Sequence, residues 1–493
     1  MIDKHQRNLA LLVASCLFME NLDGTIVTTA APRIGADLHV SPTSMGLVIT
    51  AYLITLAVLI PLSGWMVSFL GSRKVFLAAI VIFTAASLLC AASANFSELV
   101  VMRVLQGAGG AMMVPVGRLA VLARTAKADM MRMIAYIVWP ALVAPVIAPL
   151  AGGLITTYAS WRWLFLINVP LGAVALAIGT RVVPPSPRTS APPLDVGGVV
   201  LTGTGLAGLV YTAHLASEPG SGWVSVTVYA LISFALIGVT IRHLLRVTSP
   251  LVDLYTLRTK SFRAFVGGGT LFGMTVGAVP FMLPLLFQDV FGWDPVKSGT
   301  VVLFIFVGNI GIKPATTFLI NRFGFRTILV TATAGVAATV VAAGSVSATT
   351  PLALIVAIVL LNGMARSVGF TAYTTLGFSE VTREEMAHAN GLSATTQQLA
   401  TALGVAVGTV ALRIGGPIGR LFSRHPAPTT SYTVAFAVLA LFALAAMAGA
   451  TRLGPDAGSA VRRAPGRPAA GPAPTTPWSW SARPRPPRPE KGP

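Results

Sequence analysis

Charged residues are scarce in this sequence of 493 residues. They make up 10% of the chain, whereas soluble domains carry about 25%. Hydrophobic residues make up 54%. A soluble fold cannot hide that much apolar surface, but a lipid bilayer hides it readily. The composition therefore predicts a membrane protein whose length sets a number of spanning helices rather than a number of globular domains.

Cysteine and histidine are also few. Cys16 and Cys90 both fall in apolar runs, which predicts neither a disulfide framework nor a zinc site. The six histidines are scattered at or beyond the ends of the apolar runs, so no catalytic or metal-binding cluster is expected. A membrane enzyme is disfavoured on this ground, and no cofactor is expected. A non-transporting sensor would need a folded soluble output domain, and none is predicted.

Acidic residues are outnumbered by basic ones, 16 to 35, for a formal charge of +19. Nucleic-acid binding would place such charge on a patch interleaved with aromatic residues. Here the basic residues occupy short loops between apolar runs, where they orient membrane helices. The expected partner is therefore a lipid bilayer and not nucleic acid.

Apolar stretches of about 20 residues, the length that crosses hydrocarbon as a helix, recur along the chain. The pattern predicts an all-α polytopic protein with fourteen spans, placed at 9–31, 45–67, 75–94, 98–121, 133–157, 162–181, 196–216, 223–241, 262–287, 298–320, 327–347, 351–373, 392–412 and 431–451.

Loop charge predicts the orientation of these spans. An even number of spans puts both termini on one side, and loops on that side carry eighteen Lys and Arg against six on the other. The excess predicts that both termini are cytoplasmic. One segment opposes the pattern, because Arg413, Arg420 and Arg424 gather on what is expected to be the outer face. Arg33 is also assigned to an outer loop.

Five ionisable residues lie well inside predicted spans: Glu20, Asp23, Arg103, Lys313 and Arg366. Each costs at least about 2.5–3.5 kcal/mol near the bilayer centre, so each needs a partner, a wet cavity or a function. Glu20 and Asp23 share a helix face. Asp23 and Arg103 lie at similar depths, so they meet if their helices are neighbours. A carboxyl that alternates between dry and paired surroundings takes up and releases a proton; the alternative is a static ion pair that fixes packing.

Lys313 and Arg366 have Asn309 and Asn362, respectively, one helical turn away. Together these residues are predicted to line a cavity and to meet an anionic group on a substrate. The alternative is that both long side chains snorkel toward the interface.

Polar residues crowd the thirteenth predicted span, Gln397 and Gln398 among them. One face of this helix is expected to meet water in the same cavity. The alternative is that it binds another helix.

Glycine and proline are concentrated in the fourth and fifth predicted spans. Gly107 and its neighbours predict close approach of another helix. Pro145 and Pro149, followed by Gly152 and Gly153, predict a bent or softened helix.

Four runs carry a resemblance to a known family. LDGTIV at 22–27, RVLQGAGGA at 103–111 (with Gln106), APLAGG at 148–153 and WRWLFLINVP at 161–170 resemble signatures of the drug:proton antiporters of the major facilitator superfamily, in their fourteen-helix EmrB and QacA branch. The resemblance covers roughly residues 10–450.

The resemblance implies two six-helix bundles, with two extra helices between them. The expected domains are an N-terminal bundle at 1–181, a cytoplasmic linker at 182–194, two additional spans within 195–246, a C-terminal bundle at 247–452 and a disordered tail at 453–493. A Gly-x-Arg turn that occurs twice, at 71–73 and at 324–326, also suggests two related halves.

The implied function is proton-coupled export of small amphipathic or cationic compounds by alternating access, in the bacterial cytoplasmic membrane and by a monomer. The alternative cargo is an anionic or zwitterionic metabolite. Asp23 is then the coupling carboxylate and Arg103 assists proton movement. The motif at 148–153, which contains Pro149, Gly152 and Gly153, then governs the direction of exchange. The family assigns no role to Glu20, whose place rests on geometry alone.

The loop after the second span departs from the family pattern. Gly64, Gly71, Arg73 and Lys74 match it, and the second turn supplies Arg322, Gly324 and Arg326. Ser68 and Phe69, however, replace the usual acid and arginine. Since that acid is expected to latch the cytoplasmic gate, the departure bears on the gating equilibrium and not on the fold.

Overall fold

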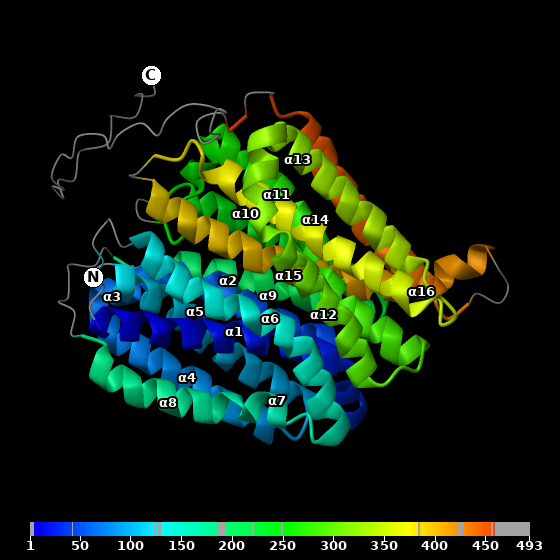
Figure 1. Cartoon of the computed structure of the whole chain (residues 1–493), viewed down its shortest axis with the longest axis horizontal. Coiled ribbons are helices and arrows are strands. Elements are labelled where there is room, and N and C mark those ends of the chain that lie inside the picture. Colours follow the sequence, from blue (N-terminus) through cyan, green and yellow to red (C-terminus); the bar gives the residue numbers. More distant parts are fainter. Residues whose placement is uncertain are drawn as a thin grey trace.

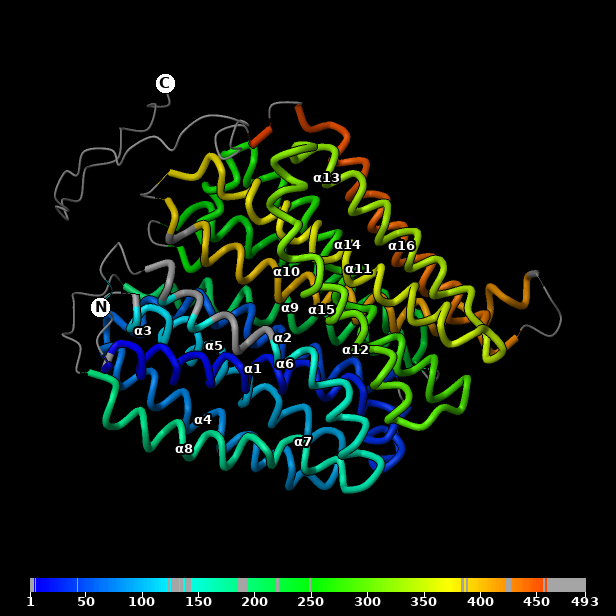
Figure 2. Tube along the Cα trace, in the orientation of Figure 1, coloured from blue at the N-terminus to red at the C-terminus, as the bar shows by residue number. Residues whose placement is uncertain are grey.

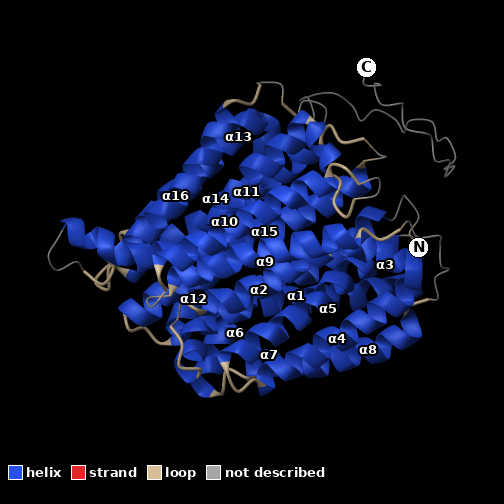
Figure 3. Cartoon of the chain, turned by 180° about the vertical axis from the view of Figure 1, so that it is seen from behind, coloured by secondary structure: helices blue, strands red, loops and turns tan. Residues whose placement is uncertain are grey.

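The structure is a computed structural model, shown in Figure 1. It describes residues 4–41, 43–122, 125, 130–184, 193–218, 221–247, 250–382, 385–422, 427–454 and 457–458. The described part of the chain is helical and contains no strand (Figure 3). Most of the predicted linker and tail lie outside these residues, as do Arg383 and Arg424.

A first group of helices packs together, with α1 against α5, α6 and α8, and α4 against α5. Its members are α1 (Lys4–Asp37), α2 (Met45–Leu59), α3 (Leu62–Leu70), α4 (Ser72–Ala92), α5 (Phe96–Leu122), α6 (Met130–Tyr158), α7 (Trp163–Leu166) and α8 (Asn168–Val182).

A second group packs in the same way, with α11 against α15 and α13 against α14 and α16. It comprises η1 (Leu254–Arg258), α11 (Lys260–Leu285), the π-helical turn η2 (Leu286–Val290), α12 (Pro295–Gly311), α13 (Lys313–Gly344), α14 (Leu352–Phe378), α15 (Met386–Phe422) and α16 (Thr430–Thr451).

Two further helices, α9 (Val196–Ser217) and α10 (Trp223–Leu244), pair with each other. Helix α9 contacts α2 of the first group and α15 of the second. Figure 2 shows the blue-to-cyan trace of the first group lying beside the green-to-orange trace of the second. Among the described residues, eleven helices are long and apolar enough to cross a membrane, or twelve if the bent pair α2 and α3 counts as one span.

Two predicted spans are broken rather than continuous. The span predicted at 45–67 bends by 57° between α2 and α3, where Pro61 stands. The span predicted at 298–320 breaks at Ile312, just before Pro314. In both cases proline removes a backbone donor and its ring crowds the preceding turn. Pro145 and Pro149 of the fifth span do not have this effect, because α6 runs unbroken from Met130 to Tyr158.

Several helices are longer than predicted. Some basic residues that were counted as loop residues therefore lie within helices. Helix α1 continues to Asp37 and α15 extends to Phe422. Arg33, Arg413 and Arg420, which the sequence assigned to loops, therefore lie in helices. Hydropathy marks where the apolar run stops, but helical hydrogen bonding continues past that point.

The repeated Gly-x-Arg turn has one backbone geometry in both halves. Gly71 has φ 85° and ψ 145°, and Gly324 has φ 79° and ψ 161°. Positive φ is open to glycine at little cost. Gly71 separates α3 from α4, and Gly324 divides α13 into two helical pieces. The repeated sequence motif therefore has a repeated backbone conformation.

The two groups meet tightly at the helix ends opposite those at which α1 begins and α16 ends. Helix α6 packs on α12, where a side chain on Gly153 would strike the backbone of Pro295 and one on Gly299 would strike the Pro149 carbonyl. Helix α2 packs on α15 with Gly46 against Thr409. We call this contact zone the seam. Small residues let the backbones approach closely there.

Candidate functional site

A buried carboxylate lies at the centre of the first helix group. Asp23 on α1 is 1% exposed and forms an ion pair with Arg103 on α5, with 2.5 Å between Oδ2 and Nη1. Its Oδ1 accepts hydrogen bonds from Gln106 Nε2 and Asn168 Nδ2, each at 2.9 Å. The meeting of Asp23 and Arg103 that the sequence depths suggested is thus present.

The Arg103 guanidinium is held on several sides. Its Nη1 donates to Gln106 Oε1 at 2.7 Å, its Nε donates to the Val48 carbonyl at 3.4 Å, and the group lies 4.1 Å from the centre of the Tyr52 ring. Gln106 also donates to Ser87 on α4. Helices α1, α2, α4, α5 and α8 therefore contribute to one polar network, and among the described residues its acid and base are Asp23 and Arg103.

Glu20 lies on the same face of α1, as predicted, but forms no hydrogen bond with Asp23. Its Oε2 atom is buried without a hydrogen-bond partner, and so is the Tyr52 hydroxyl. Both groups face Gly110. A Cβ added to this glycine would lie 3.9 Å from Glu20 Cδ and 3.3 Å from the Tyr52 hydroxyl. Two unsatisfied polar groups thus lie beside the Asp23 network.

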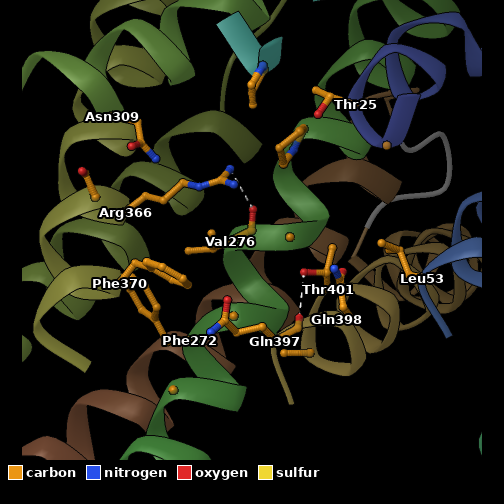
Figure 4. Close-up of a pocket in the computed structure, with 18 of the residues that line it drawn as sticks. Thr25, Leu53, Phe272, Val276, Asn309, Arg366, Phe370, Gln397, Gln398 and Thr401 are labelled. Atoms are coloured by element: carbon orange, nitrogen blue, oxygen red, sulfur yellow. Dashed lines mark hydrogen bonds between the residues drawn. The ribbon is translucent and has the colours of Figure 1, made fainter. Parts of the chain in front are cut away.

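A cavity of about 460 Å³ lies between the two helix groups (Figure 4). On α1 its lining residues are Asn21, Gly24, Thr25 and Thr28. Asp23 is not among them, because its side chain turns to the other side of the helix, into the first group. Helix α1 therefore presents one face to the cavity and holds the ion pair on another.

Five of the six residues predicted for the cavity line it: Asn309, Lys313, Arg366, Gln397 and Gln398. Asn362 does not. It is 4% exposed and donates instead to Thr339 Oγ1 on α13 at 2.9 Å. This asparagine acts as a link between helices rather than as a cavity group.

Arg366 extends toward α11 across the cavity, as Figure 4 shows. Its Nη1 lies 3.4 Å from the Val276 carbonyl and its guanidinium 5.5 Å from the centre of the Phe306 ring. The side chain therefore does not snorkel toward a membrane surface. Phe272 and Phe370 add apolar walls, and Thr401 adds a hydroxyl.

The glycine and proline motifs lie at helix contacts. A side chain on Gly107 would lie 2.9 Å from the Tyr52 carbonyl, and one on Gly152 would lie 3.0 Å from the Ile26 carbonyl. Pro145 lines the cavity, whereas Pro149 and Gly153 belong to the seam. The prolines and glycines of α6 thus extend from the cavity wall to the seam.

The loop with the unusual sequence has its own contacts. Arg73 donates to the Thr180 carbonyl at 2.6 Å, which ties it to the end of α8. Ser68 donates back to the Gly64 carbonyl, and Phe69 stacks on Trp65. Three other basic residues predicted for these turns are exposed, namely Lys74, Arg322 and Arg326.

The end of α9 and the start of α10 lie beside the seam, where α9 contacts α2 and α15, and we call the described residues 215–218 and 221–223 the strap. At one end Glu218 accepts a hydrogen bond from Ser44, the N-cap of α2. At the other, Arg413 on α15 donates to the carbonyls of Leu215, Ala216 and Ser221 at 3.0–3.2 Å. A cation suits the exposed carbonyls at a helix C-terminus. Arg413, which opposed the expected charge pattern, therefore binds this strap.

Sequence reasoning missed several of these groups. Asn168 lies in the run 161–170 that carried the resemblance, and Ser87 and Tyr52 are single polar residues in apolar runs. The only signal that marked them was a hydrogen-bonding group inside a span, which usually serves helix packing. Glu218 and Ser44 lie in short turns and gave no signal.

Spanning helices around a cavity, with a buried ion pair behind one wall, define a membrane transporter rather than an enzyme. The model of the Major Facilitator Superfamily matches residues 13–405. The chain belongs to this superfamily, and it is a multi-pass membrane protein that carries a small-molecule substrate.

Curated bacterial relatives match over most of the chain. The protein named "Putative multidrug resistance protein MdtD" is 34% identical over 407 residues in Citrobacter koseri, covering 82% of this chain and 86% of that protein. Its counterpart in Pectobacterium atrosepticum is 35% identical over 405 residues, with the same coverage. Among solved structures, a bacterial homologue of the human lysosomal transporter Spinster has a TM-score of 0.64 at 13% identity, covering 94% of this chain and all of that one.

Proposed function

We propose that this protein is a proton-coupled exporter of small amphipathic molecules that works by alternating access. The observation that carries the proposal is the Asp23–Arg103 pair, which is fully buried in a membrane helix bundle and backs directly onto the cavity wall. The names of the relatives support export of drug-like compounds.

The proposed topology is fourteen spans, with two bundles of six at 1–181 and 247–452 and two additional spans within 195–246. The linker at 182–194, the tail at 453–493 and both termini lie in the cytoplasm of a bacterial cell, and the protein works as a monomer. The excess of basic residues on the terminus side supports this orientation. The seam is then the outer gate, and the cavity faces inward.

Protonation of Asp23 would switch the first bundle between two packings. When the carboxyl is ionised, Arg103 balances it. When the carboxyl takes up a proton, Arg103 becomes an uncompensated buried charge, which costs several kcal/mol and favours a rearrangement. Gly107 and Gly152 lie where helices of this bundle would slide. One proton entering per cycle contributes about 2.3 kcal/mol for each 100 mV of potential.

The test is substrate accumulation in everted membrane vesicles with an imposed proton gradient, using a panel of cationic, neutral and anionic compounds. Asp23→Asn is expected to abolish accumulation while the protein remains in the membrane. Asp253→Asn is the matched control, since Asp253 caps η1 outside the spans and asparagine retains the cap. Normal accumulation by Asp23→Asn would refute the proposal.

The charge of the cargo separates two candidate functions. The relatives' names favour multidrug efflux, in which amphipathic and cationic compounds are carried. An anionic or zwitterionic metabolite is the second candidate, and the two cations in the cavity, Lys313 and Arg366, favour it.

A further inference from the structure

The walls of the cavity carry positive charge without negative charge. Lys313 and Arg366 are cations, and no carboxylate stands among the described residues that line the cavity. Asp23 points away from it and is already balanced by Arg103. Unbalanced cations lining a low-dielectric cleft concentrate anions and repel cations.

Arg366 has most of its hydrogen-bonding capacity free for a ligand. A guanidinium has five N–H donors in a planar fork. Within the described part of the chain the group makes one long hydrogen bond, to the Val276 carbonyl, and lies over the Phe306 ring. It forms no ion pair there. An arginine held against an aromatic ring with its fork open is suited to a carboxylate, sulfonate or phosphate group.

Lys313 places a second positive charge in the same cavity. It is the first residue of α13, where the break at Ile312 interrupts the span, and it forms no ion pair with a described carboxylate. Two unbalanced cations in one cavity repel each other. An anion between them relieves that repulsion, whereas a cationic ligand adds to it.

The remaining lining sets the rest of the ligand. Phe272, Phe306 and Phe370 offer aromatic faces, while Gln397 and Gln398 offer amide donors and acceptors. A cavity of about 460 Å³ is in the range that holds one small molecule. The geometry points to an organic anion with a flat apolar part as the substrate, its acidic group bound by Arg366 and Lys313.

This inference rests on the proposed antiport function and changes its energetics. Export of a monovalent anion in exchange for one proton moves two positive charges inward per cycle. Export of a monovalent cation by the same exchange moves none. The membrane potential therefore drives anion export and leaves cation export unaffected, which makes cargo charge measurable as a current.

The experiment uses the full chain in proteoliposomes with two permanently charged probes that share one ring system, 2-naphthalenesulfonate and (naphthylmethyl)trimethylammonium. Proton flux is followed with a trapped pH dye and charge movement on a solid-supported membrane. We expect the sulfonate to drive proton flux and a current that grows with the imposed potential, and the ammonium compound to drive neither. Proton flux driven by the ammonium compound and not by the sulfonate would overturn the inference and leave the antiport proposal intact.

Arg366→Gln tests whether Arg366 binds the acidic group of the ligand. It is expected to weaken apparent sulfonate affinity by roughly ten- to hundredfold, the usual effect of losing hydrogen bonds to a charged group. Lys313→Gln is expected to weaken it less. Arg420→Gln is the matched control, because Arg420 is exposed on α15 outside the cavity. Equal affinities in Arg366→Gln and wild type would contradict the assignment.

Absence of proton flux with either probe would refute antiport. A binding measurement would still show whether the cavity prefers an anionic or a cationic ligand. Sulfonate binding to the purified protein, measured by calorimetry and lost in Arg366→Gln, would support the anion site. No sulfonate binding, or tighter binding of the ammonium probe, would overturn it.

Discussion

Arg103 and Asp23 form a buried ion pair that joins α5 to α1, with 2.5 Å between Nη1 and Oδ2 and neither side chain exposed. Gln106 bonds to both partners, and Asn168 bonds to the acid. The pair is thus oriented by neutral groups on two helices, so a change of charge on either partner is felt across the first bundle.

The effects of substituting Asp23 and Arg103 on the stability of the protein should be strongly coupled. Arg103→Gln leaves a buried acid without its counter-charge, and Asp23→Asn leaves a buried guanidinium; each should cost about 3–5 kcal/mol. The double variant Asp23→Asn/Arg103→Gln removes both charges and should be more stable than either single variant. Thermal unfolding in detergent at neutral pH measures this. A double variant whose loss equals the sum of the single losses would show that the two charges are independent.

The seam should be sensitive to a single methyl group. Gly299→Ala places a Cβ against the Pro149 carbonyl, and overpacking of this kind costs about 1–3 kcal/mol. The end of the cavity that the seam closes, which is the proposed outer end, should therefore open more often. The probe is Thr25→Cys in the cavity, labelled by an impermeant maleimide added outside; both native cysteines are buried.

The matched control for the seam is Gly311→Ala on the same helix, where a Cβ would meet nothing within 4 Å. Labelling of Thr25→Cys should accelerate in the Gly299→Ala background and stay at the wild-type rate in the Gly311→Ala background. Equal rates in both backgrounds would show that α6 and α12 do not form the outer gate.

The strap should hold the two helix groups together beside the seam. Arg413→Gln removes donors to three carbonyls of the strap, so the strap should detach from α15. Spin labels at Val224 and Leu421, both exposed, should then give a broader distance distribution. Arg420→Gln, on the same helix but outside the strap, should leave the distribution narrow. A narrow distribution in Arg413→Gln would mean that the strap is held by other contacts.

The sequence allowed the polar centre to be predicted because charge inside a span is rare and costly. Asp23, Arg103, Lys313 and Arg366 were each found in that way, and the depths of the first two indicated their contact. Asn362 was predicted only because it lies one helical turn from Arg366, and it serves packing through its bond to Thr339. A polar residue one turn from a charged residue need not face the cavity. The packing of α13 on α14 determines whether Asn362 faces the cavity or the neighbouring helix.

Other features could not be predicted because they depend on contacts distant in sequence. Arg413 looked like an outer-loop charge, and only the approach of α9 gives it carbonyl partners. The bend at Pro61 and the unbroken path of α6 through its prolines show that the same residue type has different effects in different spans. Neighbouring helices and turns settle which effect wins.

The most direct test of proton coupling through Asp23 separates exchange from pumping in proteoliposomes that contain purified protein. Asp23→Asn is expected to exchange labelled for unlabelled 2-naphthalenesulfonate across the membrane at no net proton cost, yet to build no gradient of it when a pH difference is imposed. Wild type should do both. A substituted protein that still concentrates the compound as the wild type does would contradict the account, and loss of exchange as well would assign Asp23 to packing alone.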